Sequence, residues 1–514
     1  MEAEGRGNEA SADVDSGSDP MESIRGPGGA RRASDREHTP LFVDLDGTLV
    51  RTDLLYEAIA KVMLNPTAGG VRLISAFGAG RAAFKQVLAQ LYTPDAASLP
   101  YCVEVLTFVK EQRQLGRPVI LATASCRQWA NVVADHLQLF DHVLASDSEV
   151  NLKGPAKLVA IRDYCDQRGF EGFAYIGDSR ADVPIWQHAS ESYLSMPQPG
   201  VVKTLHDSGI PARILAQRKA RWAATLRLLR PHQWSKNLLL FVPLLLSHQL
   251  SNLPLLLHAV LAFVSFSLVA SSVYVVNDFV DFEFDRLHHR KCRRPFASGD
   301  IPLTHAIPLA GVTLGAGVLI SLYFLPLGWL QVIAVYLLAT VAYTTFFKRV
   351  VIADVVMLSV LYTLRVFGGG VACGIAVSDW LLTFSMFVFA SLGFLKRYTE
   401  LQVNFEQDVT ASAGRGYEVD DLSLISVMGI SCGMISVVVL SLYLQSDEID
   451  LIYQHKRMLW MLCPILTYWI CRVWLLARRK KVVDDPVAFA LTDPVSLLVA
   501  GITGLLLFAA SGRW

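Results

Sequence analysis

Apolar residues are distributed in two different ways along this 514-residue chain. Up to about residue 215, short apolar runs alternate with stretches of helical pattern, whereas long apolar blocks follow one another from residue 237 onward. Short strands separated by helices predict a parallel α/β sheet, and apolar blocks of roughly 20 residues predict helices that span a bilayer. We therefore expect one soluble α/β domain followed by one all-α membrane domain.

Three apolar runs in the first part predict buried strands, over residues 41–43, 118–122 and 173–176. Polar residues suited to chemistry follow each run, and the carboxyl ends of parallel strands meet at one edge of a sheet. The active site of this domain is therefore expected at that edge. Residues 1–38 carry almost no large apolar side chain, so we expect them to form a disordered tail.

The second part contains nine apolar segments long enough to cross a bilayer as helices. They are centred near residues 246, 266, 313, 334, 361, 387, 433, 465 and 502. Fifteen Lys and Arg residues fall in one set of alternate loops and three in the other. The basic side faces the cytoplasm. Because the first residues also lack a basic stretch followed by an apolar one, no cleavable signal peptide is expected.

These patterns predict a multi-pass protein of the inner (cytoplasmic) membrane, with the N-terminal domain in the cytoplasm and the C-terminus on the far face. Residues 201–236 intersperse eight basic side chains with Leu, Ile and Trp. Such a segment suits the surface of an anionic membrane, so we interpret it as a basic interfacial linker. A solvated helical linker is the alternative interpretation.

The amino-acid composition makes several classes of protein and kinds of site unlikely candidates. The chain is 53% hydrophobic and only 18% charged, with a mean hydropathy of +0.38, which argues against an ordinary soluble enzyme. Its 46 basic and 46 acidic residues cancel, so bulk charge gives no reason to expect a nucleic-acid partner. The eight cysteines form no CxxC pair, which indicates neither a zinc site nor a disulfide framework.

Two carboxylates, Asp44 and Asp46, follow the first predicted strand, and the chain then turns at Gly47. Phosphate transfer requires a nucleophile, a proton donor and a cation that neutralises negative charge. Asp178 and Asp182 follow a later strand and supply further hard oxygen ligands for Mg²⁺. Carboxylates that only cap the helices after each strand are the structural alternative.

These residues, with Thr123 and Lys157, resemble the four motifs of the haloacid dehalogenase-like phosphohydrolases, in the expected order. The resemblance implies that Asp44 is the nucleophile, Asp46 the general acid/base and a metal-site neighbour, and Thr123 a hydrogen-bond donor to the phosphate. Lys157 would stabilise charge, with Lys153 as a competitor for that role, and Asp44, Asp46, Asp178 and Asp182 would form the Mg²⁺ site. The segment between 53 and about 113 stands where this superfamily carries its substrate-selecting cap. A folded but catalytically idle regulatory domain remains an alternative.

The second apolar segment ends in a row of acidic residues. Asp278, Asp281 and Asp285 recur at i, i+3 and i+7, which places them on one face of a continuous helix. Mg²⁺ that bridges these carboxylates to a diphosphate would relieve their repulsion. The basic residues that follow, Lys291 and Arg294 among them, would contact the phosphates. A polar helix end that is paired with nearby arginines is the structural alternative.

This NDxxDxxxD segment, Asn277 included, resembles the UbiA-type intramembrane prenyltransferase superfamily over roughly residues 230–514. The resemblance implies a Mg²⁺ site at Asn277, Asp278, Asp281 and Asp285. Members with aromatic acceptors usually carry a second aspartate-rich motif, where this chain has residues 396–400, KRYTE. The stretches 231–237, 294–299, 364–370, 396–400 and 415–417 resemble the decaprenyl-phosphate phosphoribosyltransferase branch instead. The candidate substrate contacts are Lys236, Lys291, Arg294, Tyr343, Lys348, Lys396, Arg397 and Glu400.

Two of these assignments leave room for another interpretation. Tyr343 and Lys348 stand five residues apart rather than the four of the family's Tyr/Lys pair. Lys396, Arg397 and Glu400 also fit a simple cytoplasmic anchor that contains an i,i+4 Lys/Glu pair.

The sequence thus predicts four parts: the tail 1–38, a haloacid dehalogenase-like domain 39–200, the linker 201–236 and a UbiA-type domain 237–514. Our hypothesis is a bifunctional enzyme that transfers phosphoribose from phosphoribosyl pyrophosphate to a polyprenyl phosphate and then removes the 5-phosphate. The alternatives are an aromatic prenyltransferase that uses an isoprenyl diphosphate, a transporter, and a phosphatase that is merely anchored by its helices.

Overall fold

The computed structural model describes residues 39–64, 87–147, 150–406, 416–482 and 486–512. The expected disordered tail, 1–38, lies outside the described residues, as does Arg415. Two compact units are present and are described separately. The first contains Tyr101–Gln217 with the described parts of Met1–Leu49 and Gly80–Ala89; the second contains Arg218–Trp514, Gln90–Pro100 and Val50–Ala79, within the same described limits.

The first unit is built on a six-stranded parallel sheet of order β3-β2-β1-β4-β5-β6. Its strands are β1 (Leu41–Val43), β2 (Val119–Cys126), β3 (His142–Ser146), β4 (Ala174–Gly177), β5 (Glu191–Ser195) and β6 (Ala212–Ala216). The apolar run of β1 is buried on both faces, as a central parallel strand requires. Because β1 lies between β2 and β4, the ends of all three strands meet at one edge.

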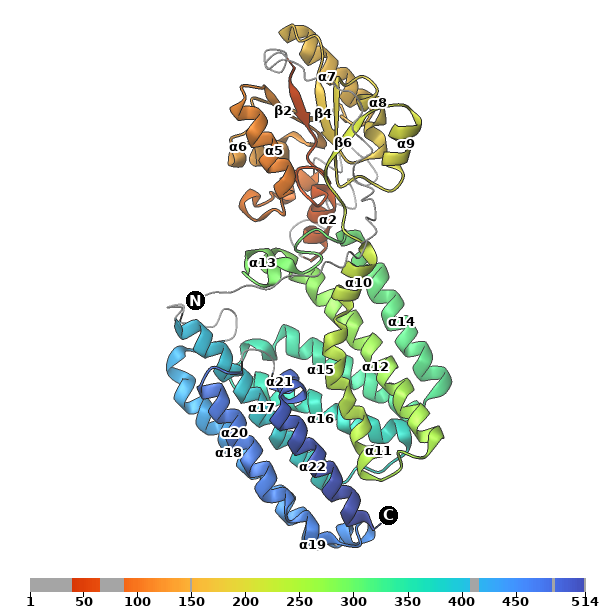
Figure 1. The fold of residues 1–514 in the computed structure, drawn as a ribbon, viewed down its shortest axis with the longest axis vertical. Helices are drawn as coiled ribbons and strands as arrows, with labels where there is room; N and C mark the ends of the chain where they lie inside the picture. The colour runs from red at the N-terminus through yellow and green to blue at the C-terminus, as the bar shows by residue number, and fades with distance from the viewer. Residues whose placement is uncertain (1–38, 65–86, 148–149, 407–415, 483–485, 513–514) are drawn as a thin grey trace, which may run out of the picture. The chain divides into compact units, whose positions relative to one another are not determined.

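Helices cover both faces of this sheet (Figure 1). They are α5 (Val103–Gln114), α6 (Arg127–Leu137), α7 (Pro155–Arg168), α8 (Val183–Trp186) and α9 (Val201–Asp207). One core joins Phe42 and Ile120 of the sheet to Ile161 of α7 and Trp186 of α8. The predicted α/β architecture of the soluble part is therefore confirmed.

The structure differs from the expected linker at its beginning. Residues 201–216, which the charge pattern placed in a basic linker, form α9 and β6, and Leu194 of β5 pairs with Ile214 of β6. The interspersed basic residues favoured a linker over a strand. An edge strand, however, tolerates exposed basic side chains such as Arg213.

The second unit is helical. Its long helices are α12 (Leu253–Val280), α14 (Ala306–Phe324), α15 (Leu327–Thr345), α16 (Ala353–Cys373), α17 (Asp379–Glu406), α18 (Leu422–Tyr443), α20 (Leu462–Arg478) and α22 (Pro494–Ser511). Each of these eight is long and apolar enough, alone or with a short flanking turn, to cross a membrane. The predicted all-α membrane domain is confirmed, with eight such helices among the described residues where the sequence suggested about nine.

The segment near residue 246 accounts for the difference. It forms a 3-10 helix, η4 (Pro231–Phe241), that continues into the short α-helix α11 (Val242–Leu246). His248 then adopts a positive φ of 55°, which ends the helical run before it reaches the length of the others. The helical path from Pro231 to Leu246 is continuous, but it is not one long α-helix.

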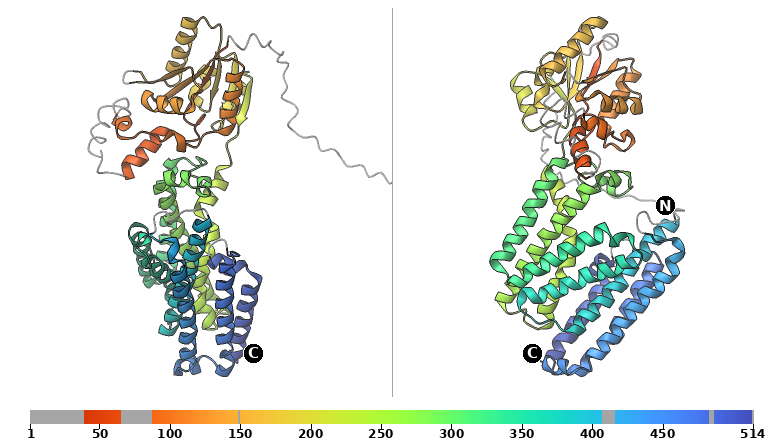
Figure 2. Two further views of the ribbon diagram at one scale, coloured as in Figure 1. Left: turned by 90° about the vertical axis from the view of Figure 1, so that its left-hand side faces the viewer. Right: turned by 180° about the vertical axis from the view of Figure 1, so that it is seen from behind.

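Alternate loops of this unit gather at opposite ends of the bundle. At one end, the His248 ring contacts Tyr453 with centroids 5.2 Å apart, and His455 N donates to Ala510 O at 3.0 Å. At the other, Ile352 N donates to the Tyr417 hydroxyl at 2.8 Å. Figures 1 and 2 show the last turn of α22 at the first of these ends. This alternation of loops is the arrangement on which the count of basic residues relied.

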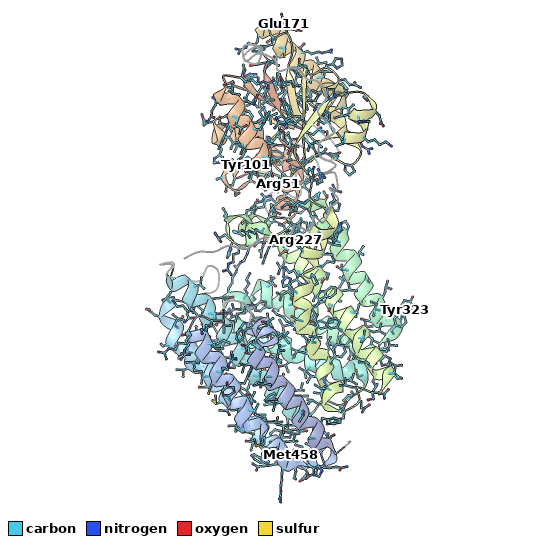
Figure 3. All side chains as sticks on the ribbon, in the orientation of Figure 1. Arg51, Tyr101, Glu171, Arg227, Tyr323 and Met458 are labelled. Carbon is cyan, nitrogen blue, oxygen red and sulfur yellow. The ribbon has the colours of Figure 1, made fainter. Side chains whose placement is uncertain are left out.

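The outer surface of the helices is apolar. Tyr323 of α14 is 78% exposed and projects outward from the bundle, as Figure 3 shows. Leu338 of α15 and Leu505 of α22 are similarly exposed. Such a surface is unfavourable in water and suits the acyl chains of a bilayer.

Two candidate active sites

The first site lies at the carboxyl end of β1. Asp44 follows Val43 directly, and its backbone N–H donates to Ile176 O of β4 at 3.0 Å, which extends the pairing of the strands. The chain turns at Gly47, where φ is +72° and an added Cβ would lie 2.8 Å from Asp178 Oδ2. A glycine is required here because a side chain would displace Asp178 from the Asp44 loop.

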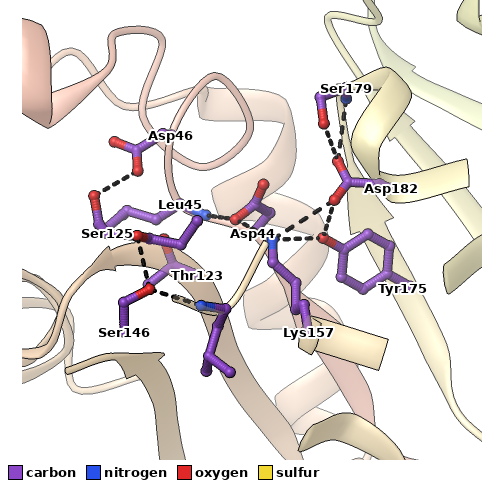
Figure 4. A network of polar contacts seen from close by, with 12 residues as sticks. Asp44, Leu45, Asp46, Thr123, Ser125, Ser146, Lys157, Tyr175, Ser179 and Asp182 are labelled. Atoms are coloured by element: carbon purple, nitrogen blue, oxygen red, sulfur yellow. Dashed lines mark hydrogen bonds and ion pairs between the residues drawn. The ribbon is translucent and has the colours of Figure 1, made fainter. Parts of the chain in front are cut away.

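Lys157 joins the carboxylates of this site (Figure 4). Its Nζ lies 2.9 Å from Asp44 Oδ1 and 3.6 Å from Asp182 Oδ1. It also donates to the Tyr175 hydroxyl at 3.0 Å, and that hydroxyl donates to Asp182 Oδ1 at 2.9 Å. Burial lowers the pKa of Lys157, but Asp44 and Asp182 outweigh burial and raise it. Lys153, the competing candidate, is exposed, so the geometry favours Lys157.

Three buried carboxylates are close enough to share a metal ion. Ligand oxygens of Asp44, Asp178 and Asp182 lie within 4.8 Å of one another. Ser179 orients Asp182 by donating to Oδ2 from both its backbone N–H, at 3.1 Å, and its hydroxyl, at 2.8 Å. Hard oxygen donors in a buried cluster fit Mg²⁺. Burial, opposed by Lys157 and reinforced by Asp182, raises the pKa of Asp44 to about 7.

Asp46 and Thr123 meet near Ser125, at the end of β2. Ser125 Oγ donates to Asp46 Oδ2 at 2.6 Å, and Thr123 Oγ1 accepts from Ser125 N at 3.0 Å. Thr123 is fully buried, whereas Asp46 is partly exposed. Five predicted residues therefore meet with Lys157 at the sheet edge where β1, β2 and β4 end. They are Asp44, Asp46, Thr123, Asp178 and Asp182. Ser125 and Tyr175 were not predicted from the sequence, because both stand inside apolar strand patterns.

The second site lies where α12 ends. The expected continuous helix is interrupted at Asp281, which caps α12 and precedes α13 (Phe282–Leu287). Asp278 and Asp285 are nevertheless both 2% exposed and lie close together. Arg294 Nη1 connects them, at 3.0 Å from Asp278 Oδ1 and 2.7 Å from Asp285 Oδ2.

A second guanidinium completes this cluster. Arg230 Nη2 donates to the same Asp278 oxygen, and its guanidinium lies 5.1 Å from the Tyr274 ring centroid. Asn277 and Asp281 are half-buried beside it, and Asp281 N donates to Asn277 O at 2.9 Å. The two buried carboxylates are thus balanced by two arginines, of which the sequence analysis identified Arg294 but not Arg230.

Two predicted lysines, Lys291 and Lys348, interact electrostatically with each other, and Lys291 also interacts with this cluster. Burial lowers the pKa of Lys291, and the neighbouring Arg294 and Lys348 lower it further, against Asp285 and Asp281. Arg294 and Lys348 therefore both act on Lys291. Lys348 lies on a separate 3-10 turn, η7 (Phe347–Arg349). Concentrated positive charge beside carboxylates suits a ligand that carries both a metal ion and phosphates.

Arg397 lies in a separate buried network at the same end of the bundle. Its Nε donates to Asp354 Oδ2 at 2.6 Å, its Nη1 donates to Glu400, and its Nη2 donates to the Tyr343 hydroxyl at 3.4 Å. The Tyr417 hydroxyl donates to Asp354 Oδ1 at 2.6 Å. The structure therefore brings Tyr343, Arg397 and Glu400 together, with Arg397 bound to two carboxylates. Asp354 was not predicted, although a charged residue inside an apolar block indicates a functional position.

The remaining candidates, Lys236 and Lys396, lie on η4 and α17. Lys236 Nζ lies 5.9 Å from the Tyr362 ring centroid, and the guanidinium of Arg365 lies 5.5 Å from the same centroid. Arg365 Nε also donates to Asn237 Oδ1 at 3.0 Å. Arg365 is buried, and like Asp354 it would have been found as a charged residue within a predicted span.

Comparisons with known proteins identify two families along the chain. Residues 238–492 match the UbiA prenyltransferase family, and residues 41–187 match the haloacid dehalogenase-like hydrolases. The uncharacterized protein y4nM of Sinorhizobium fredii is 33% identical over 90% of this chain and 89% of its own length. The decaprenyl-phosphate phosphoribosyltransferase of Mycolicibacterium smegmatis is 35% identical, over 35% of this chain and 57% of that enzyme.

A solved UbiA homolog from Archaeoglobus fulgidus, bound to GPP and Mg²⁺, is 16% identical to this chain. The match covers 56% of this chain and 99% of the homolog, with a TM-score of 0.42. The two family matches cover the two predicted motif sets. The chain belongs to the UbiA prenyltransferase family and carries a haloacid dehalogenase-like hydrolase domain ahead of its membrane part.

Proposed function

We propose that this protein transfers phosphoribose from phosphoribosyl pyrophosphate to a polyprenyl phosphate, and that its soluble domain removes the 5-phosphate from the product. The observation that carries the first step is the buried cluster of Asp278 and Asp285 with Arg230 and Arg294. Two negative and two positive groups balance one another there, so the cluster suits a ligand that also carries both signs of charge, such as a magnesium diphosphate.

In the transfer step, the anomeric C–O bond of the ribose breaks and an oxygen of the lipid phosphate forms the new bond to that carbon. The ribose develops positive charge while the departing diphosphate develops negative charge. Asp278, Asp281 and Asp285, with Asn277, would hold Mg²⁺, which neutralises the departing diphosphate when it is bound. Arg294 and Lys291 would bind phosphate oxygens, since guanidinium and ammonium groups pair strongly with them.

In the hydrolysis step, Asp44 attacks the phosphorus of the 5-phosphate and the bond from phosphorus to the ribose oxygen breaks. Asp46 gives its proton to that oxygen and then takes a proton from the water that cleaves the aspartyl-phosphate. Lys157 and the Thr123 hydroxyl would stabilise the transferred group. The metal that Asp44, Asp178 and Asp182 would hold neutralises negative charge on the phosphoryl oxygens.

The location follows from the same charges. The loops that bear the second site also bear most of the basic residues of the membrane part, so we place this end and the soluble domain on the cytoplasmic side of the inner membrane. Phosphoribosyl pyrophosphate and Mg²⁺ would then reach the site from the cytoplasm, while the lipid acceptor enters from the bilayer. Fusion of the two domains raises the local concentration of the phosphorylated product at the hydrolase.

An aromatic prenyltransferase is the second candidate, because the family to which the chain belongs is named for prenyl transfer. Membranes that contain the protein, supplied with Mg²⁺, polyprenyl phosphate, an isoprenyl diphosphate and ribose-labelled phosphoribosyl pyrophosphate, separate the two. The proposal expects label in the lipid fraction. Label that stays in water while an isoprenyl diphosphate is consumed would favour the second candidate.

A further inference from the structure

The helix α2 (Leu54–Leu64) belongs to the membrane unit although it stands between β1 and β2 in the sequence. Its Ala60 lies in one apolar cluster with Leu228 of α10 (Arg221–Leu229), Phe282 of α13 and Phe296. The approach is tight just before the helix begins, since a Cβ at Gly299 would lie 2.7 Å from Arg51 Cβ. This segment, expected to act as a cap of the hydrolase, is therefore packed against the loop that follows α12.

A buried ion pair connects α2 to α13. Both oxygens of Glu57, which is 0% exposed, accept from Arg286, with Nη1 at 3.1 Å from Oε2 and Nη2 at 2.5 Å from Oε1. Thr52 Oγ1 donates to the same carboxylate at 2.5 Å, and Arg286 Nε donates to Ala297 O at 3.2 Å. The pair is bidentate and well bonded, so removal of one partner leaves a buried charge without its counter-charge.

A second link joins the same elements. Glu283 of α13 forms an ion pair with Lys61 of α2, and it accepts from the Tyr92 hydroxyl at 3.4 Å. Two side chains of a six-residue helix are thus held by segments that precede β2 in the sequence. The held helix is the one that carries Asp285 and begins after Asp281.

We propose that Glu57 is a positioning residue for the transferase: by holding Arg286, it keeps this guanidinium from competing with the metal ion for Asp281 and Asp285. This inference rests on the proposed function, which places Mg²⁺ at those aspartates. Arg286 is next in the chain to Asp285 and five residues from Asp281, so these carboxylates are available as alternative partners of its guanidinium once Glu57 is neutral. A cation that occupies carboxylates weakens their binding of a divalent metal.

The test uses the full-length chain in lipid nanodiscs, with Asp178→Asn in every sample to disable the soluble metal site. Mn²⁺ binding is titrated by electron paramagnetic resonance, and the Mg²⁺ concentration for half-maximal transfer is measured beside it. Glu57→Gln is expected to raise both constants about tenfold, while the rate at saturating metal falls less than about threefold. Glu111→Gln, on the exposed face of α5, is the matched control and is expected to change neither constant.

Removal of the guanidinium distinguishes positioning by charge from a merely structural role. Arg286→Gln, alone or with Glu57→Gln, introduces no competing cation, so both constants are expected to stay near the parent values. If all three variants bind Mn²⁺ equally weakly, or if Glu57→Gln binds it like the parent, the inference is overturned. Glu57→Asp, which keeps the charge on a shorter side chain, replaces Glu57→Gln if that variant does not fold, with a smaller shift expected in the same direction.

The proposed function fails in a different way. A parent protein that transfers no label from phosphoribosyl pyrophosphate overturns the function, whatever the variants of Glu57 do. A parent that transfers label, combined with unchanged metal constants in Glu57→Gln, overturns only the positioning role.

Discussion

The two acidic clusters of this chain are balanced in different ways. In the soluble unit, the carboxylates of Asp44, Asp178 and Asp182 lie within 4.8 Å of one another and Lys157 is the cation that pairs with two of them. In the membrane unit, Asp278 and Asp285 are balanced by Arg230 and Arg294. The first cluster has surplus negative charge that a divalent ion neutralises. In the second, an incoming metal must displace arginines.

This difference indicates how each site is used. A hydrolase that turns over many phosphate esters benefits from a metal site that is assembled before the substrate arrives. In the transferase site, we expect the metal and the diphosphate to bind together. The metal would bind the carboxylates, and the released arginines would bind the phosphates. Metal affinity in the absence of diphosphate is therefore expected to be high in the soluble cluster and low in the membrane cluster.

The largest effect is expected in the soluble cluster. Asp44→Asn removes the nucleophile while the size of the side chain is kept, so phosphate release from the lipid product should fall by at least about ten-thousandfold. Free phosphate and the transfer of labelled ribose are measured in the same membranes. Asp163→Asn on the exposed face of α7 is the control. Loss of ribose transfer together with phosphate release would contradict the separation of the two sites.

In the membrane cluster, Asp281→Ala is expected to lower transfer by about a thousandfold, because it removes a carboxylate from the proposed metal site. The rate of label incorporation into lipid measures this loss. Asp450→Ala, whose side chain is half-exposed at the other end of the bundle and pairs with Lys456, is the matched control. Equal rates in the two variants would show that the acidic row has no part in the reaction.

Arg294→Lys tests the proposed exchange of partners. A lysine keeps the charge, but it lacks the fork that contacts Asp278 and Asp285 together, and it binds phosphate less specifically. We expect KM for the ribosyl donor to rise about tenfold with a smaller change in kcat. Steady-state kinetics at saturating Mg²⁺ provide the measurement. An unchanged KM would mean that the arginine only neutralises the aspartates.

The smallest effect concerns the stability of the metal-free soluble cluster. Because burial raises the pKa of Asp44 to about 7, the native state keeps a proton that the unfolded chain has released above about pH 4. Stability from this group therefore falls as the pH rises from about 4 to about 7 and is constant above that.

Asp44→Asn should remove this dependence, with a gain on the order of 4 kcal/mol at pH 8 and almost none at pH 4. Hydrogen exchange of the amides in β1 and β4, measured in EDTA at both values, reports the difference. A gain that is equal at the two pH values would exclude the raised pKa as its cause.

Much of the soluble site was predictable because strand ends converge by topology. Asp44, Thr123 and Asp178 are far apart in the sequence, yet the parallel order of β2, β1 and β4 brings them together. Ser125 and Tyr175 were not predictable, because their roles depend on hydrogen bonds between side chains from different elements. The short strand β6 was hidden for a related reason, as its pairing with β5 is a long-range contact.

The membrane site was predicted in its residues but not in its connections. The spacing of Asp278 and Asp285 placed them on one face, and Arg294 does connect them, even though the helix is interrupted at Asp281. No local sequence pattern predicts the ion pair of Arg230 with Asp278 or that of Arg397 with Asp354. The ion pair of Glu57 with Arg286 spans more than two hundred residues and follows from packing alone.

The intact mass of the lipid product reports on both proposed reactions in one measurement. Membranes with the wild-type chain, Asp44→Asn or Asp281→Ala are incubated with Mg²⁺, polyprenyl phosphate and phosphoribosyl pyrophosphate. We expect a lipid that carries ribose in the wild type, the same lipid with one further phosphoryl group in Asp44→Asn, and unmodified lipid in Asp281→Ala. Identical products from the wild type and Asp44→Asn, or no pentose on the lipid in any sample, would contradict it.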